Sequence, residues 1–119
     1  MKEDILKIIN HYELNHQLKY FQSEVFELNE AILKEIEIAF NSEGDFGDRE
    51  ALIKAKNHIA EEIADVMVML KQFQYYYKIS DKEVEDVMKY KVQRQLERIK
   101  IEEVNENVRT MGEEKKNRR

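Results

Sequence analysis

The chain has 119 residues, of which 38% are charged and 42% are hydrophobic, and its formal net charge is −5. This length fits one domain, and the many charged and aliphatic residues together with the absence of Pro favour a helical protein. The absence of Cys excludes a thiolate nucleophile, a disulfide framework and a Cys-based zinc site, and the negative charge provides no general attraction to nucleic acid.

Apolar residues recur at steps of three or four along most of the chain, which is the spacing of one helix face. We predict helices over about 2–13, 16–40, 49–78 and 81–108. The segment 41–48 contains two of the three glycines and is the clearest loop. Ser80 and Glu83 have the spacing of a capping box, so the last helix is expected to begin at Asp81. The sequence therefore predicts an all-α protein.

The predicted helices have apolar faces wide enough to form an antiparallel bundle. We expect a single helical domain over 1–108, followed by a charged C-terminal tail over 109–119. Long helices with few loops and much exposed charge suggest that the bundle is completed between chains, as a homodimer or homotetramer. The first residues are too charged for a signal peptide, and no stretch is apolar enough to span a membrane. We therefore expect a cytoplasmic protein with neither a membrane nor a nucleic acid as partner.

Two pairs of acidic residues stand inside apolar segments. Glu24 and Glu27 are three residues apart, and Glu62 and Asp65 have the same spacing. Residues at this spacing lie about 60° apart on one helix face, so two such helices can bring four carboxylates together. Carboxylates about 4 Å apart repel one another by roughly 4 kcal/mol at a surface-like dielectric constant, so protons or a divalent cation must neutralise them. Ligands that are all oxygen favour Mg²⁺ or Mn²⁺.

Two other interpretations of the acidic pairs stay open. In a chain with 25 acidic residues, such pairs also arise on solvated helix faces, and the protein would then be a non-catalytic interaction or regulatory module. Glu62 and Asp65 fit a solvated face less well, because they overlap the apolar run 63–70. A di-iron carboxylate bundle needs Glu-x-x-His on each of two helices, and only Glu13 and His16 match.

The two motifs resemble those of the MazG-like, all-α nucleoside triphosphate pyrophosphohydrolases, in particular the small free-standing members such as those of phages. The pattern of that family is ExxE on one helix and ExxD on the next, each within apolar sequence, and the segments 24–32 and 61–70 match it. The resemblance covers roughly residues 11–99. The chain departs from the pattern at Ser23, where the family often has a second Glu, and in the stretch between the motifs, which is longer than is common. A third departure is Arg94, which stands about where the basic helix of the family often has an Asn.

The resemblance implies an antiparallel bundle of the all-α pyrophosphatase type that cleaves a nucleoside triphosphate between its α and β phosphates. The products would be a monophosphate and pyrophosphate, and the cofactor would be Mg²⁺, with Mn²⁺ as a possible substitute. The implied metal ligands are Glu24, Glu27, Glu62 and Asp65. Glu27 and Glu62 are the two candidates for the general base that holds the attacking water. The resemblance does not choose among nucleotides.

The resemblance also implies residues that contact the substrate. Gln17 stands seven residues before Glu24, at the offset of a family glutamine, and its amide could recognise the edge of a base. Lys91, Arg94 and Arg98 lie along the helix that follows the ExxD motif, and they would form a cationic strip for the leaving pyrophosphate.

Overall fold

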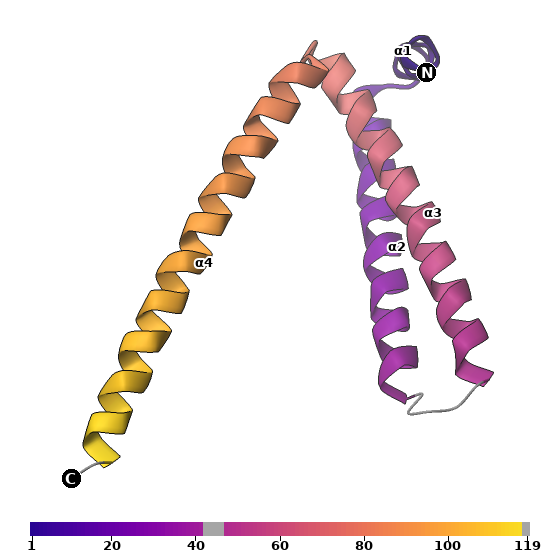
Figure 1. Cartoon of the computed structure of the whole chain (residues 1–119). Coiled ribbons are helices and arrows are strands. Elements are labelled where there is room, and N and C mark those ends of the chain that lie inside the picture. The colour runs from indigo at the N-terminus through magenta and orange to yellow at the C-terminus, as the bar shows by residue number, and fades with distance from the viewer. Residues whose placement is uncertain (42–46, 118–119) are drawn as a thin grey trace. The chain divides into compact units, whose positions relative to one another are not determined.

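The computed structural model contains four helices in the part of the chain that it describes, residues 1–41 and 47–117, with side chains at 1–41 and 49–113. The helices are α1 (Lys2–His11), α2 (Leu14–Asn41), α3 (Gly47–Tyr76) and α4 (Asp81–Asn117) (Figure 1). All regular secondary structure in the described ranges is helical, which confirms the all-α prediction. Most of the predicted loop at 41–48 lies outside the described residues.

Two helix ends differ from the predicted ones. The break between α1 and α2 falls at Tyr12 and Glu13, slightly earlier than expected, and Tyr12 has extended backbone angles. At the other end of the chain, α4 continues to Asn117 instead of ending near 108, so the part of the predicted tail over 109–117 is helical. A single Gly112 within a run of Glu and Lys, which are good helix formers, costs only about 1 kcal/mol and does not end the helix.

The chain divides into two compact units, Met1–Lys78 with α1 to α3 and Ile79–Arg119 with α4. In the first unit, α2 and α3 lie side by side and run antiparallel, and α1 packs against α3 (Figure 1). Ile5 of α1 is buried, and the Lys2 ammonium lies 5.3 Å from the ring centre of Tyr75 on α3. These contacts hold α1 against the C-terminal end of α3.

The contact between α2 and α3 is a seam in which buried and half-buried residues alternate at steps of three and four. On α2 the seam consists of Leu14, Gln17, Phe21, Glu24, Leu28, Ala31, Glu35 and Ile38. On α3 it consists of Leu52, Ala55, Ile59, Glu62, Val66, Met69 and Phe73. This alternation is the heptad pattern of helices that pack along their length. The rings of Phe21 and Phe73 meet edge to face, with centres 5.3 Å apart.

The turn that ends α3 and the cap that begins α4 both follow from local chemistry. Lys78 has a φ of 57°, the left-handed conformation that often ends a helix. The Ser80 backbone N–H donates to the Glu83 carboxylate at 2.9 Å, and the Glu83 N–H donates to the Ser80 hydroxyl at 3.1 Å. The predicted capping box is therefore confirmed, and it fixes the start of α4 at Asp81.

The second unit is the single helix α4, whose apolar residues form two stripes. The first stripe consists of Val84, Val87, Met88, Val92, Leu96 and Ile99. The second consists of Ile101, Val104, Val108 and Met111. At about 100° per residue, the two stripes lie on roughly opposite sides of the helix. Among the described helices of both units, none has a stretch long and apolar enough to cross a membrane.

Candidate metal centre

Three carboxylates meet where α2 and α3 pack together. Glu24 on α2 and Glu62 and Asp65 on α3 each offer an oxygen, and these oxygens all lie within 4.8 Å of one another. Glu24 and Glu62 occupy seam positions and are only 6% and 8% exposed, whereas Asp65 is exposed. The antiparallel seam thus brings together two acids that are far apart in sequence, and a third acid closes the cluster from the solvent side.

Two buried oxygens of this cluster accept no hydrogen bond within the described part of the chain. Glu24 Oε2 and Glu62 Oε2 are buried, and no described residue donates a hydrogen bond to either. Burial, followed by the negative charges of Glu27 and Asp65, raises the pKa of Glu62 above its ordinary value. Burial is also the largest cause of the raised pKa of Glu24, and neighbouring carboxylates add to it. The cluster therefore favours any ligand that supplies positive charge, a proton or a cation.

Two neighbours moderate the repulsion within the cluster. The Tyr20 hydroxyl donates a hydrogen bond to Glu24, which raises the pKa of Tyr20 and lowers that of Glu24 against the effect of burial. The His58 ring lies near two acids, with Nε2 3.8 Å from Glu62 Oε1 and Nδ1 3.9 Å from Glu61 Oε2. Glu61 is exposed and does not belong to the cluster.

The fourth acid of the two motifs, Glu27, lies at the edge of the cluster. It is exposed and is not among the acids whose oxygens meet within 4.8 Å. Its charge nevertheless raises the pKa of both Glu24 and Glu62, and it lines a cavity of about 660 Å³ together with Glu62 and His58. The structure thus brings three of the four predicted ligands together and places the fourth beside them.

Gln17 lies in a separate cavity of about 270 Å³ between α1, α2 and α3. It is 6% exposed, and Gln72 on α3 is 5% exposed with a buried Oε1 that accepts no hydrogen bond from any described residue. The rings of Tyr12 and His16 stack at the same cavity, with centres 5.1 Å apart. Tyr20 lines this cavity and also contacts Glu24, so the cavity adjoins the carboxylate cluster.

The remaining predicted site residues lie in the second unit. Lys91, Arg94 and Arg98 are exposed side chains of α4. Among the described residues, no histidine joins the group of acids that could hold a metal ion. His16, the one histidine that fitted a Glu-x-x-His motif, stacks on Tyr12 instead.

Sequence reasoning missed two residues of the cavity that adjoins the candidate ligands. Tyr20 lies four residues before Glu24, and Gln72 lies seven residues after Asp65. Both spacings keep the residue on the same helix face as the acid. A search for polar residues at these offsets would have found them.

Comparisons with models of known protein families, with curated proteins and with solved structures found no match to this chain.

Proposed function

We propose that the protein is a Mg²⁺-dependent nucleotide pyrophosphohydrolase that cleaves a nucleoside triphosphate, ribo or deoxyribo, between its α and β phosphates. The observation that carries the proposal is the meeting of Glu24, Glu62 and Asp65 within 4.8 Å, with two buried oxygens that accept no hydrogen bond from any residue the structure describes. A purely solvated acidic face would not bury two of its carboxylates at a helix seam. The resemblance of the two motifs to the MazG-like family supplies the reaction.

The donor set fits a hard divalent cation. All ligands are carboxylate oxygens, and Mg²⁺ and Mn²⁺ prefer such ligands. When bound, Mg²⁺ would offset the charge of the carboxylates and of the substrate phosphates and orient the phosphate to be attacked. Glu24, Glu62 and Asp65 would hold the ion, and Glu27, which lines a cavity together with Glu62, would act on it or on a neighbouring water.

The chain's own residues supply the other parts of the reaction. Water attacks the α phosphorus, the bond to the oxygen that bridges to the β phosphate breaks, and the proton of the water passes to a carboxylate. Glu27 and Glu62 are the candidates for this general base. Gln17 and the cavity that it lines would take the base, with Tyr12 and His16 as a stacking surface. For the leaving pyrophosphate, the resemblance implies Lys91, Arg94 and Arg98, which belong to the second unit.

We further propose that the bundle is completed by a second copy, as a homodimer or a homotetramer. In the first unit, the only buried apolar side chains among the described residues are Ile5, Ala31 and Met69. Exposed apolar side chains form a stripe along α3, composed of Ile63, Met67 and Leu70. An apolar stripe of this kind is typical of a helix that packs against another subunit.

The test is hydrolysis of the eight common nucleoside triphosphates and deoxynucleoside triphosphates with Mg²⁺, with pyrophosphate measured separately from orthophosphate. We expect pyrophosphate release from at least one nucleotide. Glu62→Gln should lower kcat by about 10²-fold or more, because it removes a ligand or the general base. Glu61→Gln is the matched control, since it removes an equal charge from the neighbouring exposed position.

Three outcomes would count against the proposal. Release of orthophosphate alone would mean that a different bond is cut. Equal pyrophosphate release by wild type and Glu62→Gln would mean that the carboxylate cluster is not the site. If no nucleotide is hydrolysed and Mg²⁺ does not raise the melting temperature, the interaction-module interpretation replaces the enzyme.

A further inference from the structure

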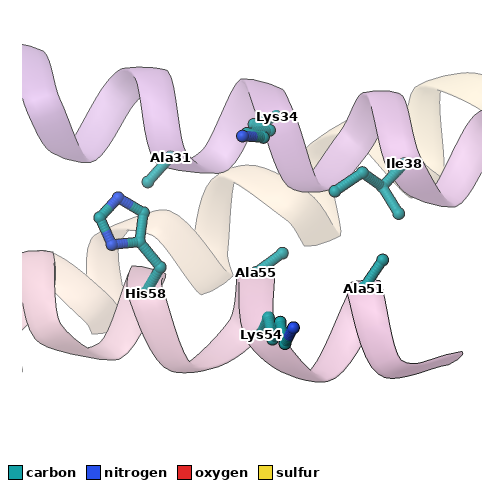
Figure 2. A pocket seen from close by; sticks show the side chains of 7 residues that line it. All are labelled: Ala31, Lys34, Ile38, Ala51, Lys54, Ala55 and His58. Carbon is teal, nitrogen blue, oxygen red and sulfur yellow. The ribbon is translucent and has the colours of Figure 1, made fainter. Parts of the chain in front are cut away.

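A groove with positive side chains lies between α2 and α3, on the loop side of the carboxylate cluster. It has a volume of about 320 Å³, and its apolar lining consists of Ala31, Ile38, Ala51 and Ala55. Figure 2 shows that these four side chains come from both helices and face one another across the groove. Small alanines at these positions leave the space that larger seam residues would fill.

The polar lining of this groove is entirely basic. Lys34 from α2 and Lys54 and His58 from α3 line it, and no carboxylate does among the described residues (Figure 2). In the described part of the chain, neither lysine forms an ion pair. The groove therefore presents two positive charges that no described acid neutralises through an ion pair.

The groove is continuous with the candidate metal centre. Lys34 and His58 also line the larger cavity that contains Glu27 and Glu62, and His58 Nε2 lies 3.8 Å from Glu62 Oε1. His58 precedes Glu62 by four residues, about 6 Å along α3. A chain of phosphates with one end at the carboxylates therefore needs to extend by only about one helical turn to meet His58 and Lys34.

The neighbouring acids decide which side of Lys34 an anion would occupy. Glu30 and Glu37 line the larger cavity together with Lys34, and their charges repel an anion there. Lys54 lines only the groove, and no described acid is among the residues that line it. The electrostatic balance thus directs an anion into the groove between the two lysines. The alanine and isoleucine side chains that line the groove make it less polar than open solvent, which strengthens charge attraction.

We propose that the groove formed by Lys34, Lys54 and His58 binds the terminal phosphates of the substrate, so that the phosphate chain runs from the carboxylates toward the loop. That the bound anion belongs to a nucleotide substrate rests on the proposed function. Binding of a polyphosphate by the groove does not depend on it. This site provides positive charge within the same unit as the carboxylates. It also fixes the direction of the substrate, with the base toward Gln17 and the phosphates toward Lys34.

The experiment is a titration of inorganic tripolyphosphate into the full chain without metal, at low ionic strength, by isothermal calorimetry. We expect binding that weakens about tenfold in Lys34→Gln and in Lys54→Gln, since each loses one charge-assisted contact. The conservative changes Lys34→Arg and Lys54→Arg should restore it. Lys56→Gln is the matched control, because it removes the same charge from the same helix about 200° around from Lys54.

Each result decides the inference. Tenfold losses in the two groove variants, with Lys56→Gln unchanged, support the groove. Equal binding by all variants, or no binding by wild type, overturns it. Failure of the groove can be distinguished from failure of the proposed reaction, because only the latter appears in the pyrophosphate assay. A groove that binds tripolyphosphate in a protein that releases no pyrophosphate would keep this site and reject the enzyme.

Discussion

Glu24 and Glu62 stand at positions of the α2–α3 seam where apolar side chains would pack best. Buried carboxylates weaken such a seam unless something neutralises them. Gln17 and Gln72 add two buried amides on the same two helices. Polar residues that interrupt a core in this way are expected at functional sites, because a fold without a function would gain stability by replacing them.

The raised pKa values of Glu24 and Glu62 predict a pH-dependent stability of the metal-free protein. Between their ordinary pKa of 4.5 and the raised folded values, the folded state holds more protons than the unfolded state. The contribution of these two groups to stability therefore falls as the pH rises through that window. We expect the double change Glu24→Gln, Glu62→Gln to have no advantage over wild type near pH 4 and a growing advantage toward pH 7.

Urea denaturation in the presence of a chelator at several pH values measures this difference. An advantage that stays constant from pH 4 to pH 7 would show that the two carboxylates titrate normally in the folded protein. Saturating Mg²⁺ should reverse the order at pH 7, because it stabilises only the protein that retains both carboxylates.

Tyr20 should act on the metal through Glu24. Its hydroxyl donates to the Glu24 carboxylate and favours the ionised form, which is the form that binds a cation. Tyr20→Phe should weaken Mg²⁺ binding at pH 7 by about tenfold, the usual effect of losing a group that supports a ligand. Part of the loss should return at higher pH, where protons compete less for Glu24.

Tyr12→Phe is the control for this change, since Tyr12 lines the same cavity but stacks on His16. Calorimetric titration with Mg²⁺ at two pH values measures both variants. Equal affinities of the two variants would mean that the hydroxyl of Tyr20 does not support the metal site.

At the scale of the helix, apolar periodicity predicted the type of each element but not its buried face. Leu14, Phe21 and Leu28 lie on the seam of α2 as a helical series should. Leu18, Val25 and Ile32 belong to the same series and are exposed. The actual seam includes Gln17, Glu24 and Ala31, which a search for large apolar residues at helical spacing does not select. Because polar residues occupy seam positions, hydrophobicity alone does not identify the buried face of α2. The packing of α2 against α3 identifies it.

The start of α4 was predicted correctly because its signal is local. Two hydrogen bonds between Ser80 and Glu83 satisfy backbone donors of the first turn, and this requires no other part of the chain. The break after α1 falls slightly earlier than the sequence predicts, since no comparable cap marks it and the helix ends at an extended Tyr12. Local chemistry can be read from sequence, whereas a boundary set by packing cannot.

The capping box at Ser80 should stabilise the first turn of α4 by about 1 kcal/mol. Ser80→Ala removes the acceptor of the Glu83 N–H and should speed amide exchange in the first turn about fivefold. Thr110→Ala is the control, because the Thr110 hydroxyl bonds only to the Glu106 carbonyl within the helix. Hydrogen exchange measured by mass spectrometry reports both. Unchanged exchange in Ser80→Ala would mean that the cap does not hold the helix start.

At the scale of the whole molecule, the helix spacing predicted that four carboxylates would meet, and three of them do. The sequence could not place the residues around them. Glu24, Glu62 and Asp65 converge because an antiparallel pair of helices aligns them. Glu27 shares a face with Glu24 yet stays at the edge, since the seam contains one residue of each pair and the second turns toward solvent. Lys34 and Lys54 carry no sequence signal, because each looks like an ordinary surface lysine until the two helices are packed.

The exposed stripe of Ile63, Met67 and Leu70 predicts self-association of the whole chain. We expect sedimentation to give a multiple of the 14.4 kDa chain mass. Met67→Lys puts a charge in the middle of the stripe, so it should reduce that mass and lower the melting temperature by several degrees. The same substitution at an exposed site of a monomer would usually change stability by only about 0.5 kcal/mol. Asn57→Lys adds the same charge at an exposed polar position of α3 and should leave both unchanged. A wild-type chain that sediments as a monomer, with both variants equally stable, would reject the assembly and leave the apolar stripe without a partner.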